Sequence, residues 1–267
     1  HEGAPAERML LLALSLFCVD GPPLPGKSAF LALRHLGFAP ARILDVGANA
    51  GHWTRGILHV FPSASVVMVE ANEARRQAWR GLPASVRGLI SVLSDKEGEV
   101  PWFTTPGPGT GDSMFQERTS WSQPSNTTRH ALTLDGLLAR EGLADGPFGL
   151  IKLDVQGAEL TVLRGAERAL SQAEVLFMEL PLAGSYNRGA PSFTESIAAL
   201  SALGWVPFDI PEQHRLVDRR EGTSFTIQVD FVFVRRGSHF LTRAQRAIGE
   251  FGTRGKESMR VVELHNR

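Results

Sequence analysis

Short apolar runs alternate along the chain with longer stretches in which apolar residues recur every three or four positions. This alternation predicts βαβ units, and therefore an α/β fold with a mostly parallel sheet covered by helices. The predicted strands are residues 42–46, 65–69, 86–93, 100–104, 148–155, 175–180, 205–210 and 224–234. The predicted helices are residues 52–60, 73–79, 134–140, 159–170 and 192–203. We expect the last strand to pair antiparallel with the strand before it.

Three segments depart from this pattern. Residues 105–128 are rich in Gly, Pro, Ser and Thr, and a loop of this length is typically functional or disordered. Residues 9–19 form an apolar run too short to span a bilayer, without the basic cluster and small residues of a signal peptide, so we interpret them as a buried helix. Residues from 238 onward are basic and weakly amphipathic. We therefore expect an N-terminal helical cap (1–40), a main domain (41–236) and a C-terminal tail (237–267).

Composition narrows the class of partner. The 267 residues contain 28 basic and 28 acidic side chains, so the net charge is zero and no footprint for nucleic acid or an anionic membrane is present. A single cysteine, Cys18, excludes an internal disulfide and a cysteine-based zinc site. We expect a cytoplasmic protein that acts on a small molecule, as a monomer or a homodimer.

The turn after the first predicted strand is the first candidate binding motif. The strand ends in Asp45, and Gly47, Ala48, Asn49, Ala50 and Gly51 follow. Glycines let the backbone approach a ligand, and open α/β sheets bind ligands at the carboxyl ends of their strands. Glycines four positions apart do not complete the cradle for a dinucleotide pyrophosphate. The Asp45 carboxylate suits a cationic ligand such as S-adenosylmethionine (SAM), and the alternative is an ordinary turn without a ligand.

Acidic and short polar residues also follow the next two predicted strands. Glu70 ends the second strand, 19 residues after Gly51, where a carboxylate can accept both ribose hydroxyls. Ser94 and Asp95 follow the third strand, where they can accept a hydrogen bond from an adenine amino group. The same residues are also compatible with a solvated strand end and a plain turn.

Residues 150–159, Leu-Ile-Lys-Leu-Asp-Val-Gln-Gly-Ala-Glu, resemble the FkbM family of methyltransferases, as do the turn after Asp45 and residues 92–98 and 133–138. The resemblance covers about residues 40–180. It implies a class I methyltransferase Rossmann-like fold with a mostly parallel seven-stranded sheet, and SAM as methyl donor. It also implies a hydroxyl acceptor on a sugar, polyketide or other specialised metabolite. Gln156 replaces the family's usual Glu, which removes one negative charge, so we expect a metal-free mechanism.

The predicted site has a donor half and an acceptor half. The expected SAM-binding residues are Asp45, Gly47, Ala48, Asn49, Gly51, Trp53, Glu70, Ala71, Asn72, Ser94, Asp95 and Asp154. Methyl transfer requires positioned reactants and a base, for which Asp154, Glu179 and His130 are candidates, with His52 as a further histidine. The expected acceptor-binding residues are Ser113, Gln156 and Tyr186. Ser113 and Tyr186 lie in loops 105–128 and 184–191, which we expect to form a lid.

Three other functions remain compatible with the pattern. A dinucleotide-dependent oxidoreductase would share the α/β order and Glu70, although the glycine spacing does not favour it. A methyltransferase of similar fold could act on an amine, because a donor site does not specify the acceptor atom. A catalytically silent module could keep the fold and serve as an interaction surface.

Overall fold

The computed structural model describes residues 24–105, 111–119, 127–182, 184 and 186–249. The predicted N-terminal helix at 9–19, part of the loop at 105–128 and the end of the tail lie outside these residues. Within the described ranges, no helix has the length and apolar character needed to cross a bilayer.

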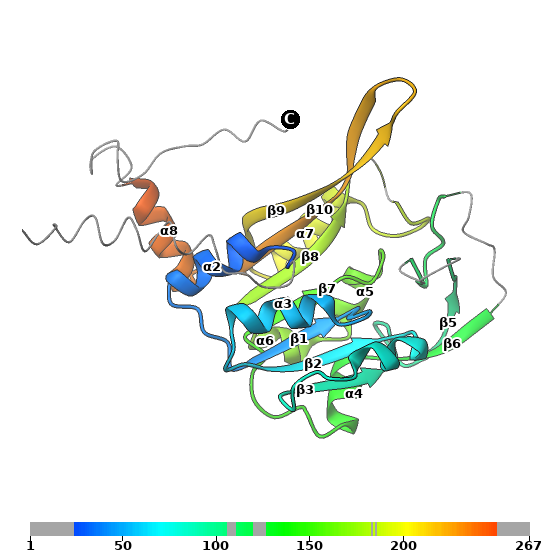
Figure 1. Ribbon diagram of the computed structural model, residues 1–267, viewed down its shortest axis with the longest axis horizontal. Helices are drawn as coiled ribbons and strands as arrows, with labels where there is room; N and C mark the ends of the chain where they lie inside the picture. Colours follow the sequence, from blue (N-terminus) through cyan, green and yellow to red (C-terminus); the bar gives the residue numbers. More distant parts are fainter. Residues whose placement is uncertain (1–23, 106–110, 120–126, 183, 185, 250–267) are drawn as a thin grey trace, which may run out of the picture.

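Seven strands form the main sheet, in the order β3-β2-β1-β7-β8-β10-β9 (Figure 1). Their bounds are β1 (Arg42–Val46), β2 (Ser65–Glu70), β3 (Val86–Ile90), β7 (Leu150–Leu153), β8 (Val175–Pro181), β9 (Trp205–Asp218) and β10 (Thr223–Arg235). Only β10 runs against its neighbours; β1, β2, β3, β7 and β8 pair parallel. The predicted class I α/β fold, with its antiparallel C-terminal strand, is confirmed.

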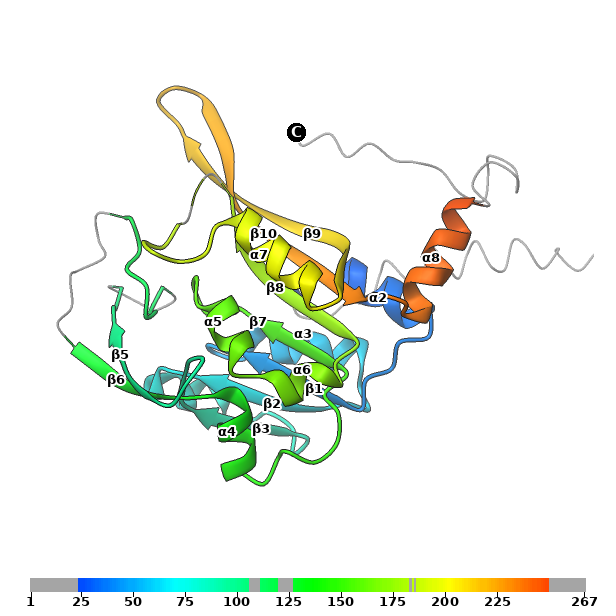
Figure 2. The same ribbon diagram turned by 180° about the vertical axis from the view of Figure 1, so that it is seen from behind.

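Helices cover both faces of this sheet (Figures 1 and 2). One face carries α2 (Lys27–His35), α3 (His52–Val60), the 3-10 helix η1 (Glu73–Trp79) and α8 (His239–Gly249). The other carries α4 (Leu134–Arg140), α5 (Glu159–Arg164), α6 (Glu167–Ser171) and α7 (Phe193–Ala202). Successive buried residues of β1, such as Ile43 and Leu44, enter opposite cores. Burial on both faces explains why these strands are continuous apolar runs.

Parts of the predicted cap and tail pack into the core of the main domain. Phe30 of α2 contacts Trp53 of α3, with ring centroids 5.8 Å apart. Phe240 of α8 contacts Phe38, with centroids 5.3 Å apart. The described residues on either side of 41–236 therefore extend one apolar core and form no separate body.

A second, three-stranded sheet lies beside the main one, in the order β4-β6-β5. It comprises β4 (Val92–Leu93), β5 (Gly98–Trp102) and β6 (Thr127–Leu132). The strand predicted at 86–93 is therefore wrong as a single element: it divides at Ser91, whose backbone N–H donates to the Glu70 carbonyl. Strand β6 was not predicted, because its first residues were assigned to the loop at 105–128.

Two further boundaries differ from the prediction. The helix predicted at 159–170 divides at Gly165, which packs so closely that a Cβ there would lie 2.4 Å from the Ser94 carbonyl oxygen. The strand predicted at 205–210 continues to Asp218, past Pro207 and Pro211. Prolines are tolerated in β9 because it is an edge strand with a single neighbour. The hairpin of β9 and β10 projects beyond the sheet (Figure 1).

Candidate functional site

A pocket of about 270 Å³ opens at the carboxyl ends of β1, β2, β7 and β8. This is the edge at which open α/β sheets bind their ligands. Its lining is polar near β1, β2, β7 and β8 and more apolar near the second sheet. The lining includes Gly47, Asn49, Glu70, Ala71, Ser91, Val92, Leu93, Trp102, Ser113, Met114, Asp154, Gln156 and Glu179.

Gly47 allows the ends of β1 and β7 to approach each other. Its φ is 77°, and a Cβ there would lie 1.8 Å from the carbonyl oxygen of Asp154. No other residue type fits this position without moving the backbone. The close approach brings the turn after β1 and the turn after β7 to the same pocket.

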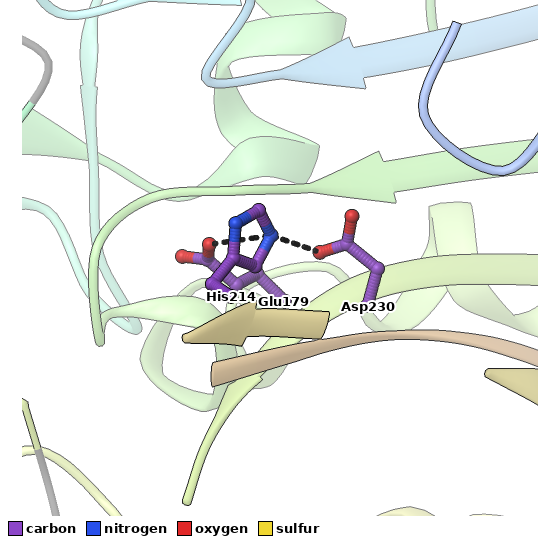
Figure 3. Close-up of side chains that lie close together, drawn as sticks. All are labelled: Glu179, His214 and Asp230. Atoms are coloured by element: carbon purple, nitrogen blue, oxygen red, sulfur yellow. Dashed lines mark ion pairs between the residues drawn. The ribbon is translucent and has the colours of Figure 1, made fainter. Parts of the chain in front are cut away.

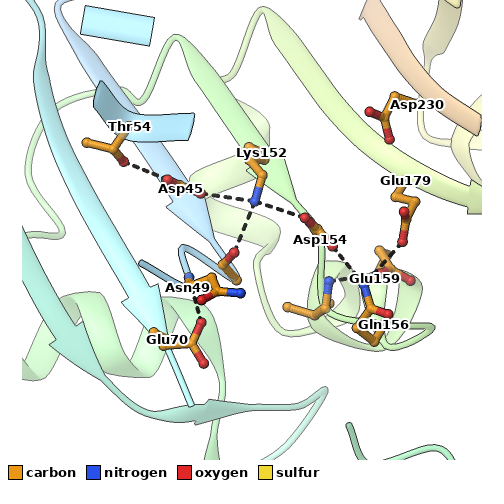
Figure 4. Close-up of polar contacts among 12 residues, drawn as sticks. Asp45, Asn49, Thr54, Glu70, Lys152, Asp154, Gln156, Glu159, Glu179 and Asp230 are labelled. Carbon is orange, nitrogen blue, oxygen red and sulfur yellow. Dashed lines mark hydrogen bonds and ion pairs between the residues drawn. The ribbon is translucent and has the colours of Figure 1, made fainter. Parts of the chain in front are cut away.

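Glu70 is fixed by the backbone of two turns. One carboxylate oxygen accepts a hydrogen bond from the backbone N–H of Asn49 at 2.8 Å (Figure 4). The other accepts from the backbone N–H of Asn72 at 2.9 Å. Each oxygen has a second lone-pair site, so the carboxylate still has acceptor capacity for a ligand. Glu70 is therefore a preorganised acceptor at the pocket wall.

A row of charges, buried except at Asp154, joins β1 to β7. The Lys152 ammonium lies 3.2 Å from Asp45 and 3.4 Å from Asp154, and it donates to the Gly47 carbonyl at 3.1 Å (Figure 4). Thr54 donates to the second Asp45 oxygen at 2.6 Å. Burial alone would lower the pKa of Lys152, but the two carboxylates outweigh that effect and raise it. This row holds the strand ends in place, and Asp45 is fully buried behind the pocket wall.

Gln156 links two carboxylates at the opposite wall. Its side-chain amide donates to Asp154 at 3.0 Å and to Glu179 at 3.2 Å. Its φ of 54° is unusual for a residue other than glycine. The Ser113 hydroxyl stabilises this turn by donating to the Gln156 carbonyl at 2.8 Å. The amide replaces a negative charge with a donor that both carboxylates share.

Glu159 stabilises the backbone of the turn after β7, to which Gln156 also belongs. One of its oxygens accepts hydrogen bonds from the backbone N–H groups of Val155 and Gly157, at 2.9 and 3.2 Å. Burial raises the pKa of Glu159 to about 7, although these two bonds act in the opposite direction. Glu159 therefore orders the turn after β7 and does not line the pocket.

A histidine and two carboxylates meet beside the pocket, and one of them, Glu179, also lines it (Figure 3). Nε2 of His214, on β9, lies 3.7 Å from Glu179 on β8 and 3.6 Å from Asp230 on β10. Burial and the neighbouring Asp154, in that order, raise the pKa of Glu179 well above its ordinary value. The pKa of His214 is also raised, chiefly by Asp230. Glu179 therefore favours its protonated form more than an ordinary glutamate does.

Two segments predicted to form a lid are bound to each other over the pocket. The buried Glu117 carboxylate accepts the hydroxyl hydrogen bond of Tyr186. Asn187 donates to the Phe115 carbonyl at 3.1 Å, and the backbone of Arg118 donates to Tyr186 at 3.1 Å. Ser113 then connects this pair to the turn after β7. The described parts of both segments form one roof.

The predicted site residues divide into two groups. Those that line the pocket are Gly47, Asn49, Glu70, Ala71, Ser113, Asp154, Gln156 and Glu179. Those outside the lining are Asp45, Ala48, Gly51, Trp53, Asn72, Ser94, Asp95, His130, Tyr186 and also His52. The first group includes candidates for both the donor and the acceptor half, so the geometry brings the two predicted halves together.

Residues outside the lining have structural partners of their own. Trp53 stacks on Phe177 in the core, with ring centroids 6.0 Å apart. Asn72 caps η1 by accepting from Ala74, and the Ser94 hydroxyl donates to Asp95. These contacts account for the residue types without a ligand.

His130, which the sequence suggested as a candidate base, lies outside the lining of the pocket. His130 lies on β6, in the second sheet, and its side chain is about half exposed. Its ring contacts Glu97 through Nε2 at 3.3 Å and Glu99 through Nδ1 at 3.5 Å. The prediction placed it at the end of a loop, because β6 was not recognised.

Several pocket residues were not predicted. Val92, Leu93 and Trp102 reach the pocket through the second sheet, which the sequence pattern did not separate from the first. Met114 lies in the roof. His214 was missed because the strand was ended at Ile210. Lys152, which does not line the pocket, carried a usable signal as a charged residue inside an otherwise apolar strand.

The family and the relatives that the chain resembles in sequence are all methyltransferases. Residues 45–204 match the family described as the methyltransferase FkbM domain. A malonyl-[acyl-carrier protein] O-methyltransferase of Geobacter sulfurreducens is 31% identical over 135 residues, which cover 48% of each chain. The 2-O-methyltransferase NoeI of Sinorhizobium fredii is 27% identical over 154 residues, 51% of this chain and 62% of that protein.

A malonyl-[acyl-carrier protein] O-methyltransferase of Methylococcus capsulatus is 33% identical over 72 residues, 27% of this chain and 26% of that protein. The matched stretches thus cover between about a quarter and three fifths of these relatives. Among solved structures, an O-methyltransferase from Bacillus cereus in complex with SAH aligns with a TM-score of 0.43 and 15% identity. That alignment covers 88% of this chain and 92% of the other.

Proposed function

The chain belongs to the FkbM methyltransferase family, with SAM as its methyl donor, and from this premise we propose that it methylates a hydroxyl group of a small molecule. The observation that carries the proposal is a single pocket with two chemically different walls. One wall presents Glu70 and turn backbone, and the other presents Asp154 and Glu179. The curated relatives at 27–33% identity are O-methyltransferases by name, which supports oxygen as the acceptor atom.

The wall at β1 and β2 is suited to the donor. Glu70 offers a fixed carboxylate to the ribose hydroxyls of SAM, and Val92 and Leu93 offer an apolar surface to its adenine ring. When bound there, SAM supplies an activated methyl group, so the protein chiefly has to position the acceptor and receive its proton.

The wall at β7 and β8 is suited to the acceptor. Asp154 accepts from Gln156 through one oxygen and faces Lys152 with the other, which favours a positioning role. Glu179 lines the pocket and has a raised pKa, which brings its proton affinity closer to that of a base working near neutral pH. We therefore assign proton removal to Glu179 and orientation of the acceptor to Asp154.

The acceptor atom is tested with methyl-labelled SAM and pairs of small molecules that differ only in carrying a hydroxyl or an amine. We expect label in the alcohols, with Glu179→Gln lowering kcat more than it changes the SAM affinity. Label only in the amines would overturn O-methylation while leaving methyl transfer intact. SAM binding without transfer to either member of any pair would favour a silent module.

We predict that Glu70→Gln weakens binding of SAM and S-adenosylhomocysteine by about tenfold or more, because the amide keeps one acceptor but loses the charge and one acceptor atom. Isothermal titration calorimetry measures this change. Glu73→Gln is the matched control, since Glu73 is exposed and pairs with Arg76 outside the pocket. Equal affinities for the two variants would remove Glu70 from the donor site.

A further inference from the structure

Two histidines of this chain lie between pairs of carboxylates, but with different geometry. Around His130, Glu97 approaches Nε2 and Glu99 approaches Nδ1, so the carboxylates face opposite ring nitrogens. Around His214, Glu179 and Asp230 both approach Nε2. An imidazole N–H donates well to one acceptor at a time, so a second carboxylate at the same nitrogen calls for another explanation.

The distances around His214 Nε2 are too long for hydrogen bonds. They are 3.7 Å to Glu179 and 3.6 Å to Asp230, and within the described part of the chain this buried nitrogen has no hydrogen-bond partner. Ligand atoms about 2.0–2.2 Å from a shared metal ion lie up to roughly 4.4 Å apart. The three ligand atoms lie within 4.8 Å of one another, so small side-chain rotations bring them to that spacing.

Burial and second-layer contacts prepare these groups for a cation. The Asp230 side chain is 8% exposed and the Glu179 side chain 14% exposed. Gln228 and Gln156 both donate to Oε2 of Glu179, which leaves Oε1 directed at His214. Metal-binding carboxylates are commonly oriented by such hydrogen bonds to the remaining oxygen.

The surrounding charge is also unbalanced. Asp154, Glu159 and Asp230 all act on Glu179, and Lys152 is the cation that opposes them among the described residues. Glu212, the next carboxylate along β9, adds further negative charge beside His214. A cation bound at this cluster would favour the ionised form of Glu179, which burial otherwise disfavours.

We propose that Glu179, His214 and Asp230 bind one divalent transition-metal ion, such as Mn²⁺ or Zn²⁺, through Nε2 and one oxygen of each carboxylate (Figure 3). One imidazole and two carboxylates suit this class of ion and leave coordination positions open. Glu179 also lines the pocket, so a bound ion would lie next to the space proposed for the acceptor. With the ion bound, Glu179 would be its ligand and not the base, and the ion would instead lower the pKa of an acceptor hydroxyl held on it. That role rests on the proposed O-methylation, whereas the binding itself does not.

The first test is metal binding by the full chain after treatment with a chelator, without SAM or acceptor. Titration with Mn²⁺ is followed by the electron paramagnetic resonance signal of the free ion, and titration with Zn²⁺ by calorimetry. We expect one ion per chain. His214→Ala should weaken binding by at least about 100-fold, more than loss of an outer-shell partner costs. His130→Ala is the matched control and should bind as the wild type does.

Absence of binding by the folded wild type overturns the proposal, as does equal binding by His214→Ala and the wild type. His214→Gln keeps the bulk of the side chain and covers the case in which His214→Ala fails to fold; its unchanged affinity would also overturn the proposal. These readouts do not involve methyl transfer. A failed metal site is therefore distinguishable from a failed assignment of the acceptor atom.

Discussion

At the scale of single residues, the site depends on how closely two backbones approach. Gly47 lets the end of β1 lie against the Asp154 carbonyl, and that contact places the turn after β1 beside the turn after β7. Gly81 has almost the same backbone conformation, with a φ of 79°, but no atom lies within 4 Å of a Cβ built there. An alanine at Gly81 would therefore meet only the strain of a positive φ, whereas an alanine at Gly47 would meet that strain and a steric overlap.

We predict that Gly47→Ala lowers the free energy of unfolding by roughly 2–5 kcal/mol and abolishes binding of S-adenosylhomocysteine. The alanine brings both a strained φ and an overlap with backbone. Gly81→Ala should cost only about 1–2 kcal/mol, from φ alone. Urea unfolding and calorimetry measure both effects. Similar losses in the two variants would show that the contact at Gly47 does not constrain the site.

At the scale of elements, the roof of the pocket is assembled from segments far apart in the sequence. Residues 113–118 pair with 186–188, and both lie over the turn after β7. The link between Tyr186 and buried Glu117 joins them, and burial with that acidic neighbour raises the pKa of Tyr186. The phenol therefore stays a donor over the whole working range of pH.

We predict that Tyr186→Phe loosens this roof, because buried Glu117 loses its hydroxyl donor at a cost of about 1–3 kcal/mol. Hydrogen–deuterium exchange should show protection of residues 113–118 and 186–188 reduced by roughly tenfold or more. Helix α7 supplies an internal reference, and its exchange should not change. Uniform acceleration across the chain would indicate global destabilisation and contradict a local role.

At the scale of the whole molecule, buried carboxylates couple stability to pH. Burial raises the pKa of Glu159 from an ordinary value of 4.5 to about 7. Between these values the folded state binds more protons than the unfolded state, so stability from this residue is present below pH 4.5 and is lost as pH rises to about 7. Stability is lost because the ionised Glu159 carboxylate is less favourable when buried in the folded state than when exposed to water in the unfolded state.

We predict that Glu159→Gln removes this part of the pH dependence. The amide oxygen can keep both hydrogen bonds, since Val155 and Gly157 donate to a single oxygen of Glu159. Relative to the wild type, the variant should gain roughly 1–3 kcal/mol between pH 4.5 and 7, with no further gain above. Chemical denaturation at several pH values measures the difference. A constant difference across this range would contradict the raised pKa.

The sequence predicted the main sheet well and the pocket in part. Strands buried on both faces, such as β1 and β2, are apolar runs that periodicity detects directly. The second sheet was missed because β4 has only two residues and β6 lies beside a long loop. His214 joins Glu179 through the pairing of β9 with β10, which local pattern does not encode.

Pro207 and Pro211 on β9 also affect how the chain behaves at high concentration. Among the described residues, no strand pairs with the outer side of β9, and an exposed edge of this length is a template for adding a strand from another molecule. Neither proline has an amide hydrogen to donate to an incoming strand. We therefore expect the prolines to make this edge a poorer template for an added strand. Replacing both should increase self-association of the protein, which light scattering measures.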